Sequence, residues 1–304
     1  MIPRTKSAKP SVKSFLDTSA AYKLQVGHSA HKKYLSEAIP KDWYVNNYVK
    51  MEYYRSSLML WVALYFECAE PFHRTFGDVL TYFSEAFGRV PKTVLQAVSR
   101  MLQSEGFSLV RPEDKEYCRQ KLQDLIFEMA LQFRETFRDM GKDPTKCARV
   151  PNHIRLPEAF ERDVVLRRAL VDFKAVKECR SRCKINHLFE REPYKKKMEL
   201  ISAIPAAGKA KVALERMREE IVKAQGKPDG ITCRSCGTMG DAVIASLLDP
   251  AWKLHSMDSV HGPVSEAIGL EHQIHLSLRA LNKASGAAAA SNATPESRNL
   301  LRPE

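Results

Sequence analysis

The sequence predicts an α/β protein in which a parallel sheet is flanked by helices and interrupted by a mainly helical insertion. Short β-prone runs, each with a helix-like segment before or after it, occur near both ends of the chain, at residues 11–16, 43–49 and 252–258. Between residues 71 and 225 the apolar residues instead recur at helical spacing. Because alternating strands and helices build parallel sheets, we expect the two flanks to form one sheet.

The first flank begins with the run SVKSFL, a predicted strand that stops at Asp17. Thr18 and Ser19 offer helix-capping side chains, so a tight turn and a helix should follow. After the β-prone stretch 43–49, residues 58–66 are too uniformly apolar for a surface helix. We therefore expect that helix to be buried.

The insertion carries several helix patterns, at about residues 94–102, 112–140, 157–188 and 209–225. In the second flank, GDAVIASLL is helix-like and WKLHSMD is a short strand ending in Asp258. The expected organisation is a disordered basic tail at 1–11, an α/β catalytic domain at 12–70 and 226–280, an insertion at 71–225 that is basic towards its C-terminal part, and a disordered tail at 281–304.

The bulk composition narrows the class of protein. The 48 Lys and Arg against 36 Asp and Glu give a formal charge of +12, which attracts phosphate polymers or anionic membrane surfaces. The longest apolar run, Leu58–Phe66, is far shorter than the roughly 20 residues of a membrane-spanning helix, so no membrane partner is expected. The basic amino terminus does not resemble a secretory signal, and seven cysteines suit reduced thiols or a metal site. We expect a cytoplasmic protein.

Four acids occupy positions where α/β proteins place functional groups. Asp17 and Asp258 follow predicted strands, whereas Glu52 and Asp241 begin helices. The carboxyl ends of strands and the adjoining helix starts line the functional crevice of such folds, and clustered carboxylates select Mg²⁺ or Mn²⁺. For each acid alone, a helix cap or a solvated turn is the competing interpretation, as for Asp249 before Pro250.

Three segments resemble the PIN nuclease family: FLDTSAAYKL, VNNYVKMEYYR and GDAVIASLLDPAWKLHSMD. The family has a strand ending in Asp and a small hydroxyl residue, a Glu at an interval like the 35 residues between Asp17 and Glu52, and a Gly-Asp-Ala helix before a strand ending in Thr-x-Asp. Ser256 stands in for that Thr. The segments cover 12–66 and 231–270, and the rest of the chain is unmatched. One departure is His261, which stands where the family often has an aromatic residue.

The resemblance implies a PIN-like, Rossmann-like fold and a divalent-metal-dependent endoribonuclease. It implies that Mg²⁺ or Mn²⁺ is held by the catalytic acids Asp17, Glu52, Asp241 and Asp258, the last through a water, and activates a water for in-line attack on RNA. Substrate binding is expected of Thr18, Ser19 and Ser256, with capping as the alternative for the first two. The alternative function is a non-catalytic PIN-like module that binds RNA or a protein. A cognate inhibitor protein and a homo-oligomer are further possible partners.

Two cysteine pairs suggest a structural metal. Cys179 and Cys183 form a CxxxC pair, and Cys233 and Cys236 form a CxxC pair. Four thiolates suit tetrahedral Zn²⁺, with His187 as a substitute ligand, although small buried thiols or redox exchange fit the same residues.

A dense run of basic residues lies between residues 174 and 197. It includes Lys195, Lys196 and Lys197, and could hold the RNA backbone beside a phosphodiesterase site. A solvated face is the alternative interpretation of such a charge run.

Overall fold

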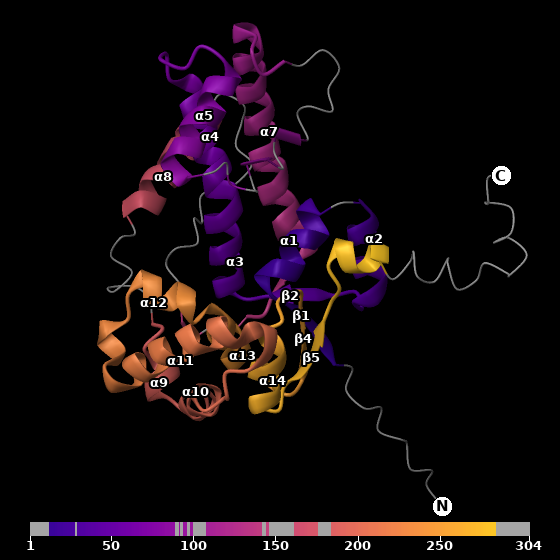
Figure 1. Ribbon diagram of the computed structural model, residues 1–304, viewed down its shortest axis with the longest axis vertical. Coiled ribbons are helices and arrows are strands. Elements are labelled where there is room, and N and C mark those ends of the chain that lie inside the picture. Colours follow the sequence, from indigo (N-terminus) through magenta and orange to yellow (C-terminus); the bar gives the residue numbers. More distant parts are fainter. Residues whose placement is uncertain are drawn as a thin grey trace, which may run out of the picture.

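The computed structural model describes residues 12–27, 29–88, 91, 94–95, 98–99, 108–141, 144–145, 161–175 and 184–283. Its centre is a five-stranded sheet with the order β3-β2-β1-β4-β5, in which every neighbouring pair is parallel (Figure 1). The strands are β1 (Lys13–Leu16), β2 (Trp43–Val45), β3 (Arg138–Asp139), β4 (Trp252–Ser256) and β5 (Glu271–Ile274). The predicted α/β class, a parallel sheet flanked by helices, is confirmed.

The central strand β1 joins the two flanks of the chain. Phe15 pairs with Tyr44 of β2 on one side and with Leu254 of β4 on the other. Phe15 and Leu16 are fully buried, as expected for the middle strand of a covered parallel sheet. The prediction that segments far apart in sequence build one sheet is therefore confirmed.

One strand comes from the segment that was expected to be a helical insertion. The two residues of β3 pair with Tyr44 and Val45, and the backbone N–H of Met140 donates to the carbonyl of Val45 at 2.9 Å. The segment 71–225 thus contributes an edge strand to the sheet as well as helices. Both residues of β3 are exposed, so the sequence has no alternation of apolar and polar residues that would predict this strand.

The helices near the sheet are α1 (Thr18–Val26), α2 (Ser29–Ala38), α3 (Asn47–Tyr53), α13 (Gly240–Leu247) and α14 (His261–Ala267). The remaining ones are α4 (Met59–Ala69), α5 (Phe76–Phe87), α7 (Pro112–Thr136), α8 (Arg162–Ala175), α9 (His187–Glu190), α10 (Tyr194–Ser202), α11 (Lys211–Gly226) and α12 (Cys233–Thr238), with 3₁₀ turns at Gly208–Ala210 and Pro228–Gly230. The helix expected at 209–225 is confirmed as α11, whereas α7 ends before the expected residue 140. Most of the helix expected at 94–102, part of the one at 157–188, the tail at 1–11 and residues 284–304 lie outside the described residues. Residues 281–283, which were expected to be disordered, are helical.

The helices form two groups around the sheet. Helices α4, α5, α7 and α8 extend away from the sheet as a pillar, while α9 to α12 lie beside α13 (Figure 1). In the pillar, the Tyr65 hydroxyl of α4 contacts Arg119, Gln123 and Asp163, which ties α4 to α7 and α8. None of the described helices is long and apolar enough to cross a membrane.

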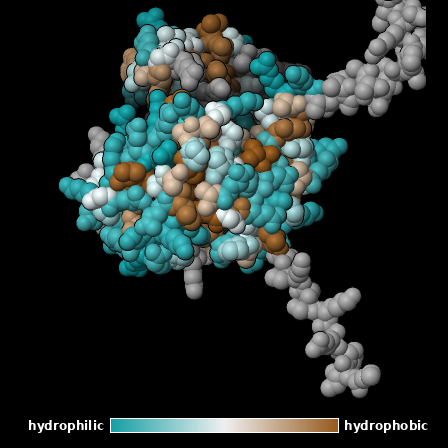
Figure 2. Space-filling view, turned by 60° about the horizontal axis from the view of Figure 1, so that its bottom comes forward, coloured by the Kyte–Doolittle hydropathy of each residue, from teal (hydrophilic) through white to brown (hydrophobic). Residues whose placement is uncertain are grey.

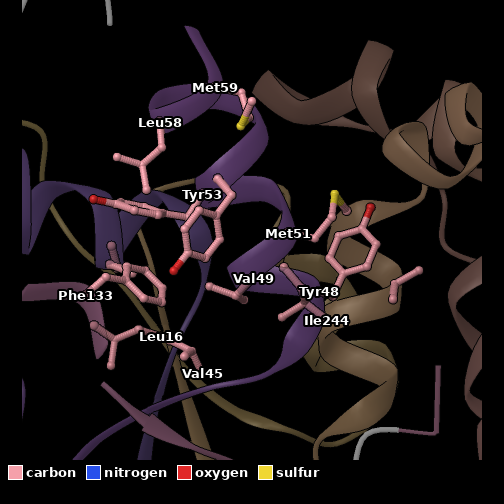
Figure 3. Close-up of a cluster of buried hydrophobic side chains, with 14 of the residues drawn as sticks. Leu16, Val45, Tyr48, Val49, Met51, Tyr53, Leu58, Met59, Phe133 and Ile244 are labelled. Atoms are coloured by element: carbon pink, nitrogen blue, oxygen red, sulfur yellow. The ribbon is translucent and has the colours of Figure 1, made fainter. Parts of the chain in front are cut away.

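The core beside the site is built around α3 and the start of α4 (Figure 3). Tyr53 is fully buried, and its ring centroid lies 4.2 Å from that of Phe133 on α7. Between α3 and α4 the chain makes a π-helical turn, Tyr54–Leu58, in which the N–H of Met59 reaches back to the carbonyl of Tyr54. The expected burial of residues 58–66 is confirmed for most of that segment, including Leu58 and Trp61.

Candidate active site

Asp17 lies at the carboxyl end of the central strand and begins α1. Its Oδ1 accepts the backbone N–H of Ala20 at 2.8 Å, which makes it the N-cap of α1. Its Oδ2 accepts the Ser256 hydroxyl at 2.7 Å, and Ser19 Oγ lies 2.8 Å from the same oxygen. Burial raises the pKa of this carboxyl, but the hydrogen bond and charge of His261, with Ser256 and the Ala20 N–H, outweigh it and lower the pKa below its ordinary value. Asp17 is therefore a buried, ionised carboxylate.

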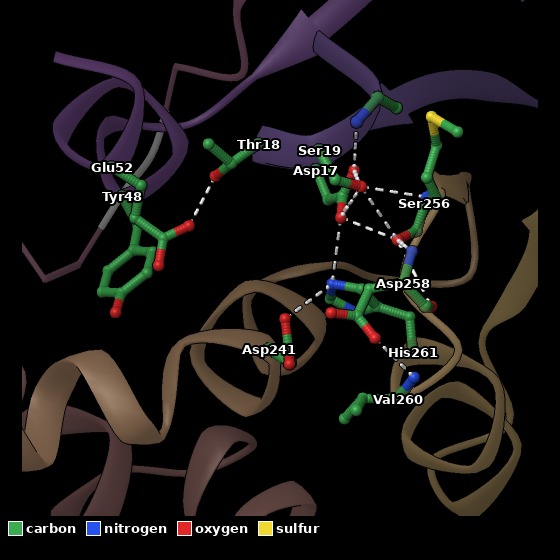
Figure 4. Close-up of polar contacts among 12 residues, drawn as sticks. Asp17, Thr18, Ser19, Tyr48, Glu52, Asp241, Ser256, Asp258, Val260 and His261 are labelled. Atoms are coloured by element: carbon green, nitrogen blue, oxygen red, sulfur yellow. Dashed lines mark hydrogen bonds and ion pairs between the residues drawn. The ribbon is translucent and has the colours of Figure 1, made fainter. Parts of the chain in front are cut away.

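Glu52 projects from α3 towards the start of α1. Thr18 Oγ1 donates to its Oε2 at 2.5 Å, so the first residue of α1 positions this carboxyl (Figure 4). Burial, together with the negative charges of Asp241 and Asp17, raises the pKa of Glu52 to about 7, despite the Thr18 hydrogen bond. The three acids thus interact electrostatically as one group.

Gly240 explains how Glu52 comes so close to α13. A Cβ placed on Gly240 would lie 2.8 Å from Glu52 Oε1 and 3.1 Å from the Tyr48 hydroxyl. Any larger residue would push the carboxyl away from the helix that carries Asp241. Tyr48 fixes the same interface, since its hydroxyl donates to the carbonyl of Cys236 at 2.7 Å. The glycine of the Gly-Asp-Ala motif is therefore needed for close approach rather than for a left-handed backbone.

His261 connects Asp17 and Asp241, a role that the sequence analysis did not assign to it. Its Nε2 lies 3.0 Å from Asp241 Oδ1 and 3.4 Å from Asp17 Oδ2, and the side chain is fully buried (Figure 4). Burial lowers the pKa of His261, but the charges of Asp241 and Asp17 and their hydrogen bonds raise it to about 10. The imidazolium is thus a built-in cation between two carboxylates. The departure from the family's aromatic residue was the one sequence signal for it.

Asp258 has a different place from the other three acids. It is exposed, and its Oδ1 accepts the backbone N–H of Val260 at 3.0 Å in the turn before α14. Its own backbone N–H donates to Ser256 Oγ at 2.8 Å. The contacts of Asp258 are those of a turn-stabilising residue, and a role at the metal remains a prediction.

The three hydroxyl residues expected at the substrate hold the acids in this structure. Thr18 donates to Glu52, while Ser19 and Ser256 donate to Asp17. Ser19 also accepts the backbone N–H of Met257 at 2.9 Å, which ties α1 to the loop after β4. The structure therefore gives these hydroxyls a positioning role, and their expected contact with RNA stays a prediction.

The donor chemistry of the acidic group fits a hard divalent cation. Asp17, Glu52 and Asp241 supply carboxylate oxygens, the ligands preferred by Mg²⁺ and Mn²⁺. As the side chains stand, no set of three or more His, Cys, Asp or Glu residues in the described part of the chain is arranged to enclose a metal ion. The geometry gives the reason, because Glu52 turns to Thr18 and His261 lies between the two aspartates. Enclosing a metal here requires side-chain movement.

The described lysines of the basic run lie on α10, which packs against α13. Lys195 and Lys196 are exposed on α10, whereas the Lys197 ammonium donates to carbonyls at the C-terminus of α13, Ser246 and Leu248. Substrate binding by these lysines stays a prediction, and Lys197 also holds α10 against α13.

The four-cysteine zinc site is not tested by the described residues. Cys179 and Cys183 lie outside them, as does the side chain of Cys233. Cys236 is buried on α12, and its thiol lies 3.8 Å from the Tyr48 hydroxyl. The zinc site stays a prediction.

Comparisons of the chain with protein-family models, with curated proteins and with solved structures found no match. The class of the site is therefore defined by its own geometry. It is a partly buried group of three carboxylates and one histidine, gathered where the central parallel strand ends and where α3 and α13 pass it.

Proposed function

We propose that this chain is a divalent-metal-dependent endoribonuclease of the PIN type. The observation that carries the proposal is the gathering of Asp17, Glu52 and Asp241, which lie as much as 224 positions apart in sequence, into one electrostatically coupled group. Folded proteins tolerate such mutual repulsion when a cation neutralises the group or when some members are protonated. A raised pKa in a group of this kind is typical of a functional site.

The residues of the chain have distinct tasks in the proposed reaction. A bound Mg²⁺ or Mn²⁺ would activate a water and stabilise negative charge on the phosphodiester. Asp17, Glu52 and Asp241 would hold it, with Ser19, Ser256 and Thr18 fixing the first two carboxylates. His261 would keep Asp17 and Asp241 together, as their shared counter-ion, before the metal arrives.

The positions of the three acids relative to the strands and helices support the PIN proposal. The first acid ends the central strand, the second lies on the helix after the neighbouring strand, and the third lies on the helix before β4. The choice of RNA over DNA rests on the resemblance to the family alone.

The proposal is tested with purified protein and a fluorescent single-stranded RNA, in the presence of Mg²⁺, Mn²⁺ or a chelator. Asp241→Asn is the preferred variant, since Asp241 is one-third exposed and does not cap a helix, in contrast to Asp17. Metal-dependent cleavage that falls at least 100-fold in Asp241→Asn supports the proposal. Equal cleavage by the two proteins, or cleavage that persists in chelator, contradicts it.

His261 favours a second candidate, a PIN-like module that binds RNA without cutting it. The imidazolium lies between Asp17 and Asp241 and offsets one of their two negative charges, so the repulsion in the site is reduced without metal. This candidate predicts RNA binding in chelator and no cleavage with any divalent metal.

A further inference from the structure

Arg55 lies on the same side of its helix as two residues of the candidate active site. Tyr48, Glu52 and Arg55 follow one another at helical spacing along α3 and the π-helical turn. All three face the segment 236–240 that leads to Asp241. Tyr48 bonds to Cys236, Glu52 approaches Gly240, and Arg55 Nη1 would lie 3.8 Å from a Cβ on Gly237. The guanidinium therefore sits over the exposed end of α12, one turn beyond Glu52.

The charge of Arg55 is not neutralised within the described part of the chain. The residue is exposed, and the ion pairs and hydrogen bonds found among the described residues do not include its guanidinium. Other arginines of the chain are paired, such as Arg119 with Asp163 at 3.0 Å and Arg162 with Asp124 at 2.7 Å. A free guanidinium beside a carboxylate group is suited to a ligand that carries its own negative charge.

The surface beyond Arg55 continues to be basic. Arg234 is exposed on α12, and its positive charge helps to lower the pKa of Glu220 after the hydrogen bonds from Ser235 and Lys223. Next to it, a hollow between α11 and α12 is lined by Lys223, Lys227 and Ser235, among others. Lys223 is paired with Glu220 at 2.9 Å, whereas Lys227 is exposed at the rim.

The hydropathy of this part of the molecule agrees with a wet, polar contact surface. Figure 2, which turns the lower helices of Figure 1 forward, shows mostly hydrophilic side chains with separate, small hydrophobic areas. Such a surface suits a charged polymer better than an apolar partner.

We propose that Arg55 binds the phosphate next to the scissile bond of a single-stranded RNA, and that the strand continues over α12 past Arg234 to the hollow at Lys227. The identity of the polymer rests on the proposed function. Arg55 offsets the repulsion between the substrate phosphates and the acids, because a guanidinium forms two parallel hydrogen bonds to one phosphate. The π-helical turn gives the guanidinium its place above Gly237.

Binding is measured separately from cleavage, by fluorescence anisotropy of a labelled single-stranded RNA in chelator, over a series of salt concentrations. The variants are Arg55→Ala, Arg55→Lys and Lys227→Ala. Lys41→Ala is the matched control, because Lys41 is an exposed cation between α2 and β2. All four substitutions lie on exposed side chains, and thermal melts verify the folding of each variant.

We expect Arg55→Ala to weaken binding about tenfold and to lower the slope of log affinity against log salt by about 0.7, the value of one phosphate contact on a single strand. Arg55→Lys should keep the slope and lose part of the affinity, and Lys227→Ala should show a smaller loss. Lys41→Ala should match the wild type. RNA binding with these effects but without any cleavage supports the proposed RNA path over Arg55, Arg234 and Lys227 and contradicts the proposed nuclease activity. Cleavage with an unchanged salt slope in Arg55→Ala contradicts the RNA path and leaves the proposed nuclease activity standing. An absence of RNA binding also contradicts the RNA path.

Discussion

A Cβ on Gly240 would lie 2.8 Å from Oε1 of Glu52, closer than real Cβ atoms approach an oxygen. Because Gly240 has no side chain, α3 and the start of α13 can approach each other this closely. The same contact determines the distance between Glu52 and Asp241, because Asp241 is the next residue on α13.

Gly240→Ala should therefore displace Glu52. We expect about 1–3 kcal/mol of destabilisation from overpacking and a loss of RNA cleavage of about 100-fold, since a displacement of about 1 Å is that costly at an active site. Gly226→Ala, at the end of α11, is the control, because nothing lies within 4 Å of its Cβ position. Equal cleavage by Gly240→Ala and the wild type would contradict the role of this contact.

The free energy of unfolding should change with pH in a way that reports the raised pKa of Glu52. Its pKa is raised from 4.5 to about 7, so the fold favours the protonated carboxyl. That contribution is complete below pH 4.5 and is lost as the pH rises through about 7, a difference on the order of 3 kcal/mol. The free energy of unfolding in urea, measured in chelator at pH 5 and pH 8, should fall more in the wild type than in Glu52→Gln. Parallel curves for the two proteins would argue against the raised pKa.

His261 should determine how strongly the protein depends on divalent metal. Its pKa is raised to about 10, so the stability that it contributes is present below pH 6.5 and is lost as the pH rises towards 10. At neutral pH, His261→Gln leaves Asp17 and Asp241 facing each other without a cation, at a cost of about 3–5 kcal/mol. Mn²⁺ should restore the melting temperature of this variant more than that of the wild type.

The control for this experiment is His272→Gln, a histidine that lies 4.0 Å from the exposed Glu266. Its response to Mn²⁺ should equal that of the wild type. An identical metal response in His261→Gln would show that the imidazolium is not a substitute for the metal charge.

Elemental analysis of protein purified without chelators checks the predicted zinc site. One zinc per chain is expected, and Cys233→Ser should remove it and loosen the segment that contains α9 to α12. Cys118→Ser is the matched control, since Cys118 is a buried thiol on α7. Zinc-free wild-type protein would rule out the four-cysteine site.

Local sequence was sufficient to predict the parts of the site that lie next to strands. Asp17 follows a buried, β-prone run, and Asp241 begins an apolar helix, so their places followed from the strand and helix patterns. These elements have strong patterns because they are covered on both sides. The prediction that Glu52 begins a helix was wrong, because β2 ends at Val45 and α3 begins at Asn47, which places Glu52 next to the last residue of α3.

The rest of the site depends on contacts between distant segments. No local pattern tells which carboxylates His261 will meet, or that Ser256 will donate to Asp17 across 239 positions. No sequence pattern singled out Arg55, because its position depends on the π-helical turn and on Gly237, which lies opposite it. The strand β3 was missed because both of its residues are exposed.

The central position of β1 has a consequence for synthesis on the ribosome. β1 emerges well before its neighbour β4, which begins only at Trp252, and His261 follows later still. Until then one edge of β1 lacks its partner strand, and such long-range pairing makes folding slow. Asp17 and Glu52 emerge close together, but Asp241 and His261 join them only after a further stretch of about 200 residues has been made. A chain interrupted before β4 cannot complete the sheet, and its Asp17 carboxylate lacks the contacts with Ser256 and His261.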